Sequence, residues 1–193
     1  KFALTSFQIL KARKHLEDSG FKLLFPERSV NSSYFDTQKL RCFEESEEGL
    51  LPRKKIRLRH YGDQKFNLET KISSIEGRFK TAKTISKSHY ERLLKHGYMD
   101  NFYGNVLPKI NIQYDREYFV RGDIRVTIDS NLLYKRFGKE NGLNISNLSI
   151  LEIKIDKLAV PHIIDSLFPF QRVRYSKYSE AIKALNLRGY FTF

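Results

Sequence analysis

Charged and apolar side chains alternate along several short segments, and this alternation constrains the fold more than any other feature of the sequence. In Lys55-Ile56-Arg57-Leu58-Arg59, every second residue is a cation and the residues between are aliphatic. The same period, with acids and bases mixed on the charged side, recurs at 68–72, 124–129 and 151–155. Successive side chains of a strand point to opposite faces. The chain is therefore predicted to form an antiparallel sheet with one apolar face and one face of mixed charge.

Further patterns predict the remaining elements. Period-two segments indicate strands at 1–4, 30–36, 54–61, 65–72, 109–120, 124–129 and 149–155. Apolar stripes with end signals predict a helix capped by Thr5 or Ser6 and stopped by Gly20, a second over 86–95, and a third over about 176–187. Loops are predicted at 44–52, 62–64 and 138–147. Because no repeat or linker interrupts the chain, one domain is expected over 1–193.

The chain carries an excess of positive charge. Lys and Arg number 35 against 22 acidic residues, which gives a net charge of +13. Such an excess favours an anionic partner, and by itself it fits nucleic acid, acidic lipid or phosphate compounds. The single cysteine, Cys42, excludes an internal disulfide, so a cytoplasmic location is expected. No apolar run approaches the roughly 20 residues of a membrane span, and none is predicted in this chain.

The charged strand faces have two interpretations. On pattern alone, a face exposed to water is the simpler one. Alternatively, the sheet closes into a barrel with its helices outside, so that the charged faces line a lumen. Cations crowded into such a lumen favour a polyanion such as a phosphate chain, and the carboxylates among them favour a divalent cation bound to phosphate oxygens. Nucleic acid is the disfavoured partner, because the aromatic residues do not alternate with the cations.

Eight short strings then point to a known family. They are KFAL at 1–4, VNSSYFDT at 30–37, KIRLRHYG at 55–62, LETK at 68–71, YDR at 114–116, RVTID at 125–129, LEIK at 151–154 and YSKY at 175–178. In this order the strings resemble the polyphosphate polymerase domain of the vacuolar transporter chaperone (VTC) complex and its relatives in the CYTH or triphosphate tunnel superfamily.

The resemblance implies an α+β fold, a closed eight-stranded antiparallel β-barrel that forms a triphosphate tunnel with helices packed outside. It implies binding of ATP, polyphosphate or triphosphate and transfer of the γ-phosphoryl group with Mg²⁺ or Mn²⁺. The phosphate-binding residues expected are Lys1, Lys55, Arg57, Arg59, Lys71, Arg116, Arg125, Lys154, Arg174, Ser176 and Lys177. Catalytic roles are expected for Arg57, Arg59, Lys71, Glu152 and Lys154. Glu152 or Glu69 is expected to bind the metal.

Several alternatives stay open at this stage. The protein could be a polyphosphate polymerase, a triphosphatase or polyphosphatase, or a non-catalytic polyphosphate-binding module. Either Arg41 or Arg53 could supply a further cation to the lumen. Asp129 could orient a cation or close a turn. Tyr34 is expected to be a core aromatic residue, Cys42 is expected to be inert, and no pattern indicates an oligomeric state.

Overall fold

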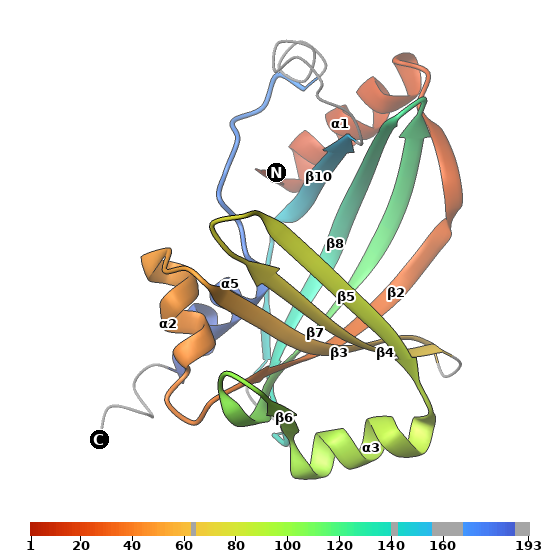
Figure 1. The fold of residues 1–193 in the computed structure, drawn as a ribbon. Coiled ribbons are helices and arrows are strands. Elements are labelled where there is room, and N and C mark those ends of the chain that lie inside the picture. The colour runs from red at the N-terminus through yellow and green to blue at the C-terminus, as the bar shows by residue number, and fades with distance from the viewer. Residues whose placement is uncertain (63–64, 140–142, 156–167, 188–193) are drawn as a thin grey trace. The chain divides into compact units, whose positions relative to one another are not determined.

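The computed structural model describes residues 1–62, 65–139, 143–155 and 168–187, and Figure 1 shows its elements. The helices are α1 (Ser6–Asp18), α2 (Arg41–Glu48), α3 (Lys87–His96) and α5 (Lys177–Ala184). The strands are β1 (Phe2–Leu4), β2 (Lys22–Asp36), β3 (Arg53–Tyr61), β4 (Lys65–Ser73), β5 (Arg78–Ile85), β6 (Tyr98–Asp100), β7 (Gly104–Arg121), β8 (Ile124–Arg136), β9 (Leu143–Ile145) and β10 (Ser149–Ile155). The predicted α+β class is confirmed.

The strands follow one hydrogen-bonded path. The order is β1-β10-β8-β7-β2-β3-β4-β5, with β6 paired to β7 and β9 paired to β8. The ladders from β1 to β8 and from β2 to β5 are antiparallel, as the alternation predicted. The path contains eight strands, and their closure into a barrel stays a prediction.

The chain forms two compact units, to both of which β2, β7 and β8 contribute residues. Unit 1 comprises 1–29, 114–132 and 145–175, and unit 2 comprises 30–113, 133–144 and 176–193. The expectation of a single domain stays a prediction.

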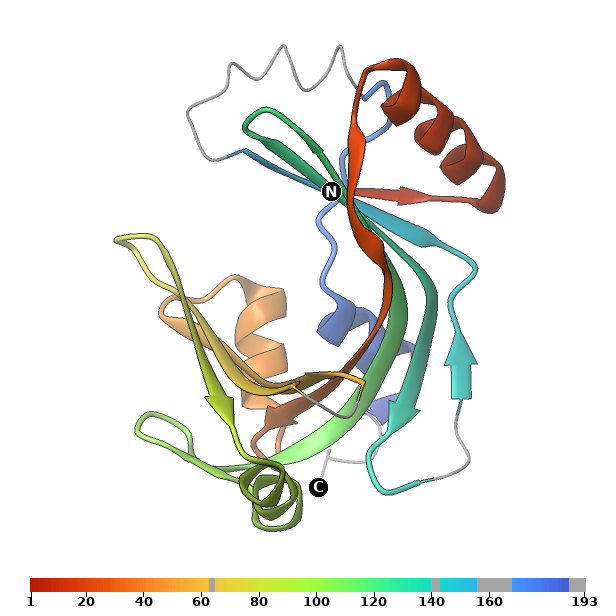
Figure 2. The same ribbon diagram turned by 90° about the vertical axis from the view of Figure 1, so that its right-hand side faces the viewer.

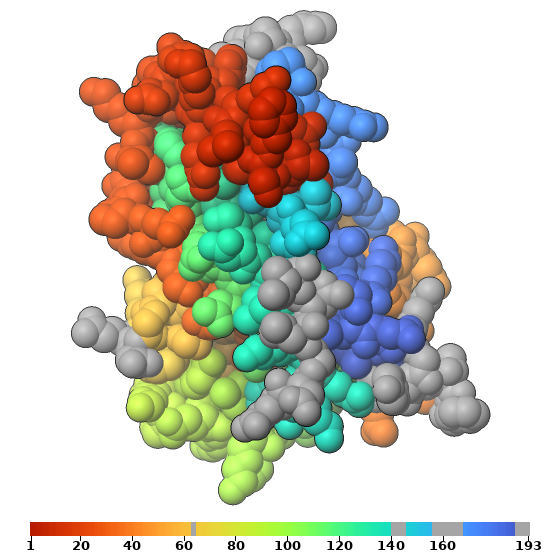
Figure 3. Space-filling model, turned by 180° about the vertical axis from the view of Figure 1, so that it is seen from behind, coloured from red at the N-terminus to blue at the C-terminus, as the bar shows by residue number. Residues whose placement is uncertain are grey.

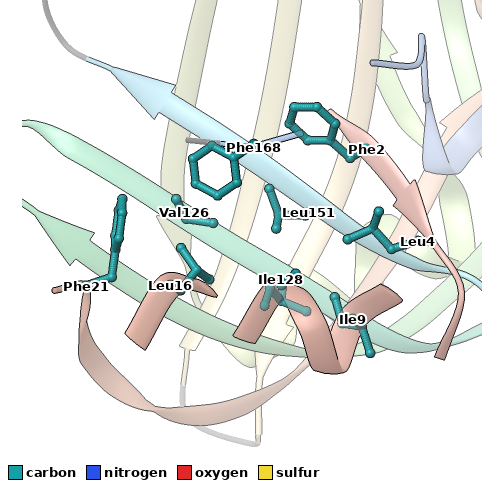
Figure 4. Packing of buried hydrophobic residues seen from close by; sticks show 10 residues of the cluster. Phe2, Leu4, Ile9, Leu16, Phe21, Val126, Ile128, Leu151 and Phe168 are labelled. Atoms are coloured by element: carbon teal, nitrogen blue, oxygen red, sulfur yellow. The ribbon is translucent and has the colours of Figure 1, made fainter. Parts of the chain in front are cut away.

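In unit 1, α1 packs on the apolar side of β1, β10 and β8 (Figure 4). The helix begins with a capping box, in which the Thr5 hydroxyl accepts a hydrogen bond from the N–H of Gln8 and the Gln8 side chain accepts one from the N–H of Thr5. The registers place Phe2 beside Leu151 and Leu151 beside Ile128, so their side chains share one face. The prediction of a helix from Thr5 to just before Gly20 is confirmed.

In unit 2, strands β2 to β5 lie side by side, and α3 covers their apolar face (Figure 2). Ile56 and Leu58 of β3 are fully buried there. Tyr90 of α3 packs on Phe66 of β4, with 4.7 Å between the ring centroids. The helix predicted over 86–95 is confirmed, and Ser86 caps it with its hydroxyl, which accepts a hydrogen bond from the N–H of His89.

Two segments that were predicted as loops contain a helix or a strand, because contacts with distant parts of the chain define those elements. The predicted loop at 44–52 contains most of α2, whose first turn is held by buried Asp36, the acceptor of hydrogen bonds from the N–H groups of Cys42 and Phe43. That capping carboxylate lies outside the helix segment, so a local pattern does not show it. The predicted loop at 138–147 contains β9, while its residues 140–142 lie outside the described part of the chain, as do residues 63–64 of another predicted loop.

The strand β5 was not predicted at all. Its residues 78–84 are exposed and have no apolar alternation, and only pairing with β4 defines the strand. The strands β2, β7 and β8 are also longer than predicted, and α5 ends at Ala184 rather than near 187. In β2 the added residues 22–29 are exposed, so no buried face marks them in the sequence.

Truncation of a buried side chain in α1 tests the packing of unit 1. Leu16→Ala removes a fully buried side chain and is expected to lower the free energy of unfolding by about 2–5 kcal/mol. The N-terminal segment that contains α1, red in Figure 3, lies partly at the surface. Leu10→Ala on the same helix removes a side chain that is 61% exposed and is expected to change the free energy of unfolding by less than about 0.5 kcal/mol. Urea denaturation followed by circular dichroism measures both, and equal losses would contradict the described packing.

Candidate phosphate-binding site

The polar face of β3, β4 and β5 in unit 2 gathers cations by register. Arg57 pairs with Glu69, and Glu69 pairs with Ala82 of β5. One step along, Lys55 lies beside Lys71 and Lys71 beside Lys80. The shared face therefore carries Lys55, Arg57, Arg59, Lys71 and Lys80 around a single glutamate. Lys80 was missed by the sequence analysis because β5 was not recognised as a strand.

Glu69 lies at the centre of this face. Its carboxylate accepts a hydrogen bond of 2.7 Å from Arg57 Nε and one of 3.0 Å from Lys80 Nζ, and Arg59 Nη1 lies 3.8 Å away. Burial raises the pKa of Glu69, but Arg57, Arg59 and Lys80 outweigh it and lower the pKa to about 2. Glu69 is therefore ionised at neutral pH and offsets part of the charge of its neighbours.

The two arginines are also held from strand β2. Arg57 Nη1 donates to the hydroxyl of Tyr34 at 2.8 Å, and Arg59 Nε donates to Ser32 Oγ at 3.2 Å. The prediction that Tyr34 is a core aromatic residue is confirmed by its burial, but its hydroxyl also serves the charged face. Both guanidinium groups are thus oriented by neutral partners as well as by Glu69.

The beginning of α5 joins the same set. Ser176 is the N-cap of the helix, and its hydroxyl accepts a hydrogen bond of 2.8 Å from Lys55 Nζ. The next residue, Lys177, is 9% exposed. Tyr178 then stacks on Tyr34 with 5.2 Å between the ring centroids. Ser176 and Lys177 therefore lie with the β3 cations, from which they are distant in the sequence.

Unit 1 carries a second set of charged residues. Lys1 Nζ lies 3.8 Å from Glu152 Oε2, and β10 and β8 place Lys154 beside Arg125. Arg116 donates two hydrogen bonds, of 2.5 and 2.8 Å, to fully buried Asp129. Of the two interpretations of Asp129, orientation of a cation is therefore the one that the structure supports.

The predicted residues thus divide between the two units, and each set is described within its own unit. The set of unit 2 is Lys55, Arg57, Arg59, Glu69, Lys71, Ser176 and Lys177, and the set of unit 1 is Lys1, Arg116, Arg125, Glu152, Lys154 and Arg174. Arg174 lies between Val173, whose N–H donates to Lys1 O, and Tyr175, whose carbonyl accepts from Lys1 Nζ. Phosphate binding by these residues stays a prediction.

The two glutamates differ in their fit to a divalent metal. Among the residues that the structure describes, no three His, Cys, Asp or Glu side chains form a ligand cluster. Mg²⁺ in phosphate-handling sites is held by one or two carboxylates together with phosphate oxygens, so a single glutamate is enough. Glu69 fits poorly because three cations surround its oxygens. Glu152 fits better, because its side chain is 25% exposed against 8% for Glu69 and its ion pair with Lys1 spans 3.8 Å.

The remaining candidates take structural roles. Arg41 donates to Glu45 within α2, and Arg53 donates to the carbonyl oxygens of Gly49 and Leu50 just after that helix. Both therefore have partners at α2. Cys42 is buried, and burial together with Asp36 raises the pKa of its thiol, which agrees with the expectation of an inert residue. In the described part of the chain, no helix is long and apolar enough to cross a membrane.

Comparison with solved structures defines the class of the fold. A structure described as a candidate adenylate cyclase from Bacillus halodurans has a TM-score of 0.55 at 11% identity, covering 96% of this chain and 87% of that one. A conserved protein from Pyrococcus furiosus has 0.51 at 12%, covering 96% and 87%. An adenylyl cyclase candidate from Hippeastrum, described as having a dominant triphosphatase activity, has 0.51 at 13%, covering 96% and 85%. The fold is that of the CYTH or triphosphate tunnel proteins.

The family follows from the sequence match. The VTC domain matches residues 1–186, so the chain belongs to the VTC domain family. No curated protein matches the chain at a significant level. The resemblance predicted from the eight strings is thereby confirmed.

Replacement of Glu69 tests the charge balance of the unit 2 face. The folded protein holds the pKa of Glu69 at about 2 against an ordinary value of 4.5, so its contribution to stability is complete above pH 4.5 and is lost as the pH falls towards 2. Glu69→Gln is expected to lower the free energy of unfolding by about 1–3 kcal/mol at neutral pH, with a smaller difference in acid. Urea denaturation at a series of pH values measures this difference.

The control for this series is Glu91→Gln on the exposed side of α3. This variant is expected to follow the wild-type stability at every pH. If Glu69→Gln were as stable as the wild type at neutral pH, the described role of Glu69 would be wrong.

Proposed function

We propose that this chain is a polyphosphate polymerase-type domain, which binds ATP or polyphosphate in a basic tunnel and transfers the γ-phosphoryl group with Mg²⁺ or Mn²⁺. Closure of the eight-stranded path into a barrel and a cytoplasmic location are parts of this proposal. The observation that carries it is the unit 2 face, where Lys55, Arg57, Arg59, Lys71 and Lys80 surround a single carboxylate.

The unit 2 face suits a linear polyanion. Five cations with one carboxylate among them repel one another, and an anion that contacts several of them relieves this repulsion. Arginine presents N–H donors in a planar fork that matches phosphate oxygens. Because Tyr34 and Ser32 already orient Arg57 and Arg59, less conformational entropy is lost when a phosphate binds.

The proposed reaction needs positioned charge and little covalent chemistry. The bond between the γ-phosphorus and the oxygen bridging it to the β-phosphate breaks, ADP leaves, and a new bond forms to an oxygen of phosphate or of a polyphosphate end. Arg57, Arg59 and Lys71 would stabilise the charge of the γ-phosphoryl group in transfer, and Lys154 is proposed as a further catalytic residue. When bound, Mg²⁺ or Mn²⁺ would neutralise phosphate charge, and Glu152 is the residue that would hold it.

The remaining phosphate-binding candidates belong to the same proposal. Lys1, Lys55, Arg116, Arg125, Arg174, Ser176 and Lys177 are proposed to hold the non-reacting phosphates. Lys80 is added to them, because its register places it beside Lys71 on the same face.

Hydrolysis is the second candidate function. Water in place of the phosphate acceptor would release free phosphate from a triphosphate. The Hippeastrum protein of similar fold, described as having a dominant triphosphatase activity, motivates this alternative. A non-catalytic module that binds polyphosphate is the third possibility.

The first test uses Arg57→Ala. The purified protein is incubated with ATP and Mn²⁺ or Mg²⁺, polyphosphate is read on a gel, and free phosphate is read by a colour reaction. Because Arg57 is proposed to contact the transferred group, the variant is expected to lose at least about tenfold in product formation. Arg92→Ala, which removes an exposed arginine of α3, is the matched control and is expected to keep full activity.

The product of the wild-type protein separates the candidates. Polyphosphate identifies a polymerase, and free phosphate without polyphosphate identifies a hydrolase. Binding of polyphosphate without turnover, weakened by Arg57→Ala, identifies a binding module. A wild-type protein that neither binds nor turns over these compounds would refute the proposal.

A second test separates metal binding from phosphate binding. Glu152→Gln removes the proposed metal ligand and is expected to reduce turnover by roughly 100-fold, while tripolyphosphate binding without metal changes by less than about threefold. Isothermal titration calorimetry measures the binding, and a Mn²⁺ titration of the turnover measures the metal requirement. Glu17→Gln on the exposed side of α1 is the control. Unchanged turnover and Mn²⁺ requirement in Glu152→Gln would remove Glu152 from the site.

A further inference from the structure

Tyr34 of β2 lies against the cations of the unit 2 face. Its hydroxyl accepts a hydrogen bond of 2.8 Å from Arg57 Nη1, and its ring packs under the Arg57 guanidinium, with 5.6 Å from Cζ to the ring centroid. The residue is 6% exposed. Glu69 holds another edge of the same guanidinium at 2.7 Å from Nε. Arg57 is therefore fixed between two acceptors, of which one is a carboxylate and the other a phenol.

A second tyrosine fixes the position of the first. Tyr178 of α5 is stacked on Tyr34 with 13° between the ring planes, and its hydroxyl donates to Asp36 Oδ2 at 2.5 Å. Asp36 also accepts hydrogen bonds from backbone N–H groups of Thr37, Cys42 and Phe43. Because Asp36 and Tyr178 are fully or almost fully buried, this arrangement leaves the Tyr34 ring little freedom to move.

The surroundings of the Tyr34 hydroxyl favour its ionised form. Burial raises the pKa of Tyr34, but the positive charges of Arg57, Arg59 and Lys177 outweigh burial and lower the pKa to about 8. Three other charged or titratable groups lie next to Tyr34 and Arg57. Glu69 is bound to Arg57, and Tyr178 and Asp36 lie on the side of the Tyr34 ring that stacks on Tyr178. The Tyr34 hydroxyl thus lies among three cations, and its ionised form would compete for their positive charge with any anion that binds to this face.

We propose that Tyr34 is a positioning residue for Arg57, and that binding of a phosphate chain to this face is coupled to protonation of the Tyr34 hydroxyl. The inference rests on the proposed phosphate-binding function of the face. A phenolate at Tyr34 neutralises Arg57 and repels phosphate oxygens, whereas a neutral phenol orients Arg57 without competing for its charge. A bound phosphate chain in turn offsets the cations that favour the phenolate.

The direction of the pH dependence follows from this coupling. In the free protein the hydroxyl loses its proton as the pH rises through about 8, and a bound polyanion raises that pKa. Below this value Tyr34 is neutral in both states and adds no pH dependence. Above it, binding must take up a proton, so the affinity falls as the pH rises, by about fivefold between pH 8 and about pH 9.

The experiment measures tripolyphosphate binding by calorimetry across this pH range for the wild type and Tyr34→Phe. Phenylalanine keeps the stacked ring and removes the hydroxyl. At pH 7 the variant is expected to bind about three- to tenfold more weakly, because Arg57 loses an orienting acceptor. Above pH 8 the wild-type affinity is expected to fall more steeply than that of the variant. Titration of the ligand itself and of the lysines is common to both proteins and cancels in the comparison.

Tyr90→Phe is the matched control, because it removes a phenol hydroxyl from the apolar side of the same unit. This variant is expected to keep the wild-type pH profile. Near-ultraviolet absorbance of tyrosinate gives a readout that needs no ligand, since one tyrosine should titrate near pH 8 in the wild type and in Tyr90→Phe but not in Tyr34→Phe.

Three results would overturn the inference, and the third of them would also overturn the proposed function. Parallel pH profiles of wild type and Tyr34→Phe would exclude the coupling while leaving phosphate binding intact. Absence of a tyrosine that titrates near pH 8 would exclude the ionised form of Tyr34. A wild-type protein that binds no tripolyphosphate at any pH would refute both this inference and the proposed function.

Discussion

The unit 2 face depends on the ion pairs that Glu69 forms with Arg57, Arg59 and Lys80. Five basic side chains from three neighbouring strands share one face, and their mutual repulsion would oppose pairing of those strands if no negative charge lay among them. Glu69 supplies that charge at the middle strand, with Arg57 on one side and Lys80 on the other. One carboxylate reduces the repulsion among five cations and leaves the face with a net positive charge. A ligand with several negative charges would neutralise the positive charge that Glu69 leaves on this face.

The alternation of side chains predicted the sheet, and the reason lies in the burial of one parity. Ile56 and Leu58 are fully buried under α3 while Arg57 lies on the opposite face. The alternation of residue types in β3 therefore indicates both the buried face and the polar face of the strand. Strand β5 has no such mark, because its residues 78–84 are exposed and its pairing with β4 is set by neighbouring strands. Lys80 was missed for that reason. Helix α2 was missed because Asp36, which caps it from strand β2, lies outside the helix in sequence.

The candidate site was predictable as a set of residue types but not as a set of contacts. Family strings identified Arg57, Ser176 and Lys177, and the structure adds that Ser176 accepts from Lys55. The role of Asp129 was open in the sequence, because an aspartate at the end of a predicted strand fits a turn as well as an ion pair. Its bidentate partner Arg116 lies 13 residues away, across β7 and β8. The role of the Tyr34 hydroxyl could not be predicted from the sequence, since a buried aromatic residue is usually explained by packing of its ring alone.

The contacts of α5 have a consequence for how the site is made. Tyr178 bonds to Asp36 across 142 residues of sequence, and Lys55 bonds to Ser176 across 121. A chain growing on the ribosome therefore carries its β3 arginines long before the residues that brace them have been synthesised. Closing loops of this length is slow compared with local folding, so the braced geometry of Arg57 is among the last features to form. An unfinished chain consequently exposes its basic strands before Ser176 and Tyr178 are present to hold Lys55 and the Tyr34 ring in place.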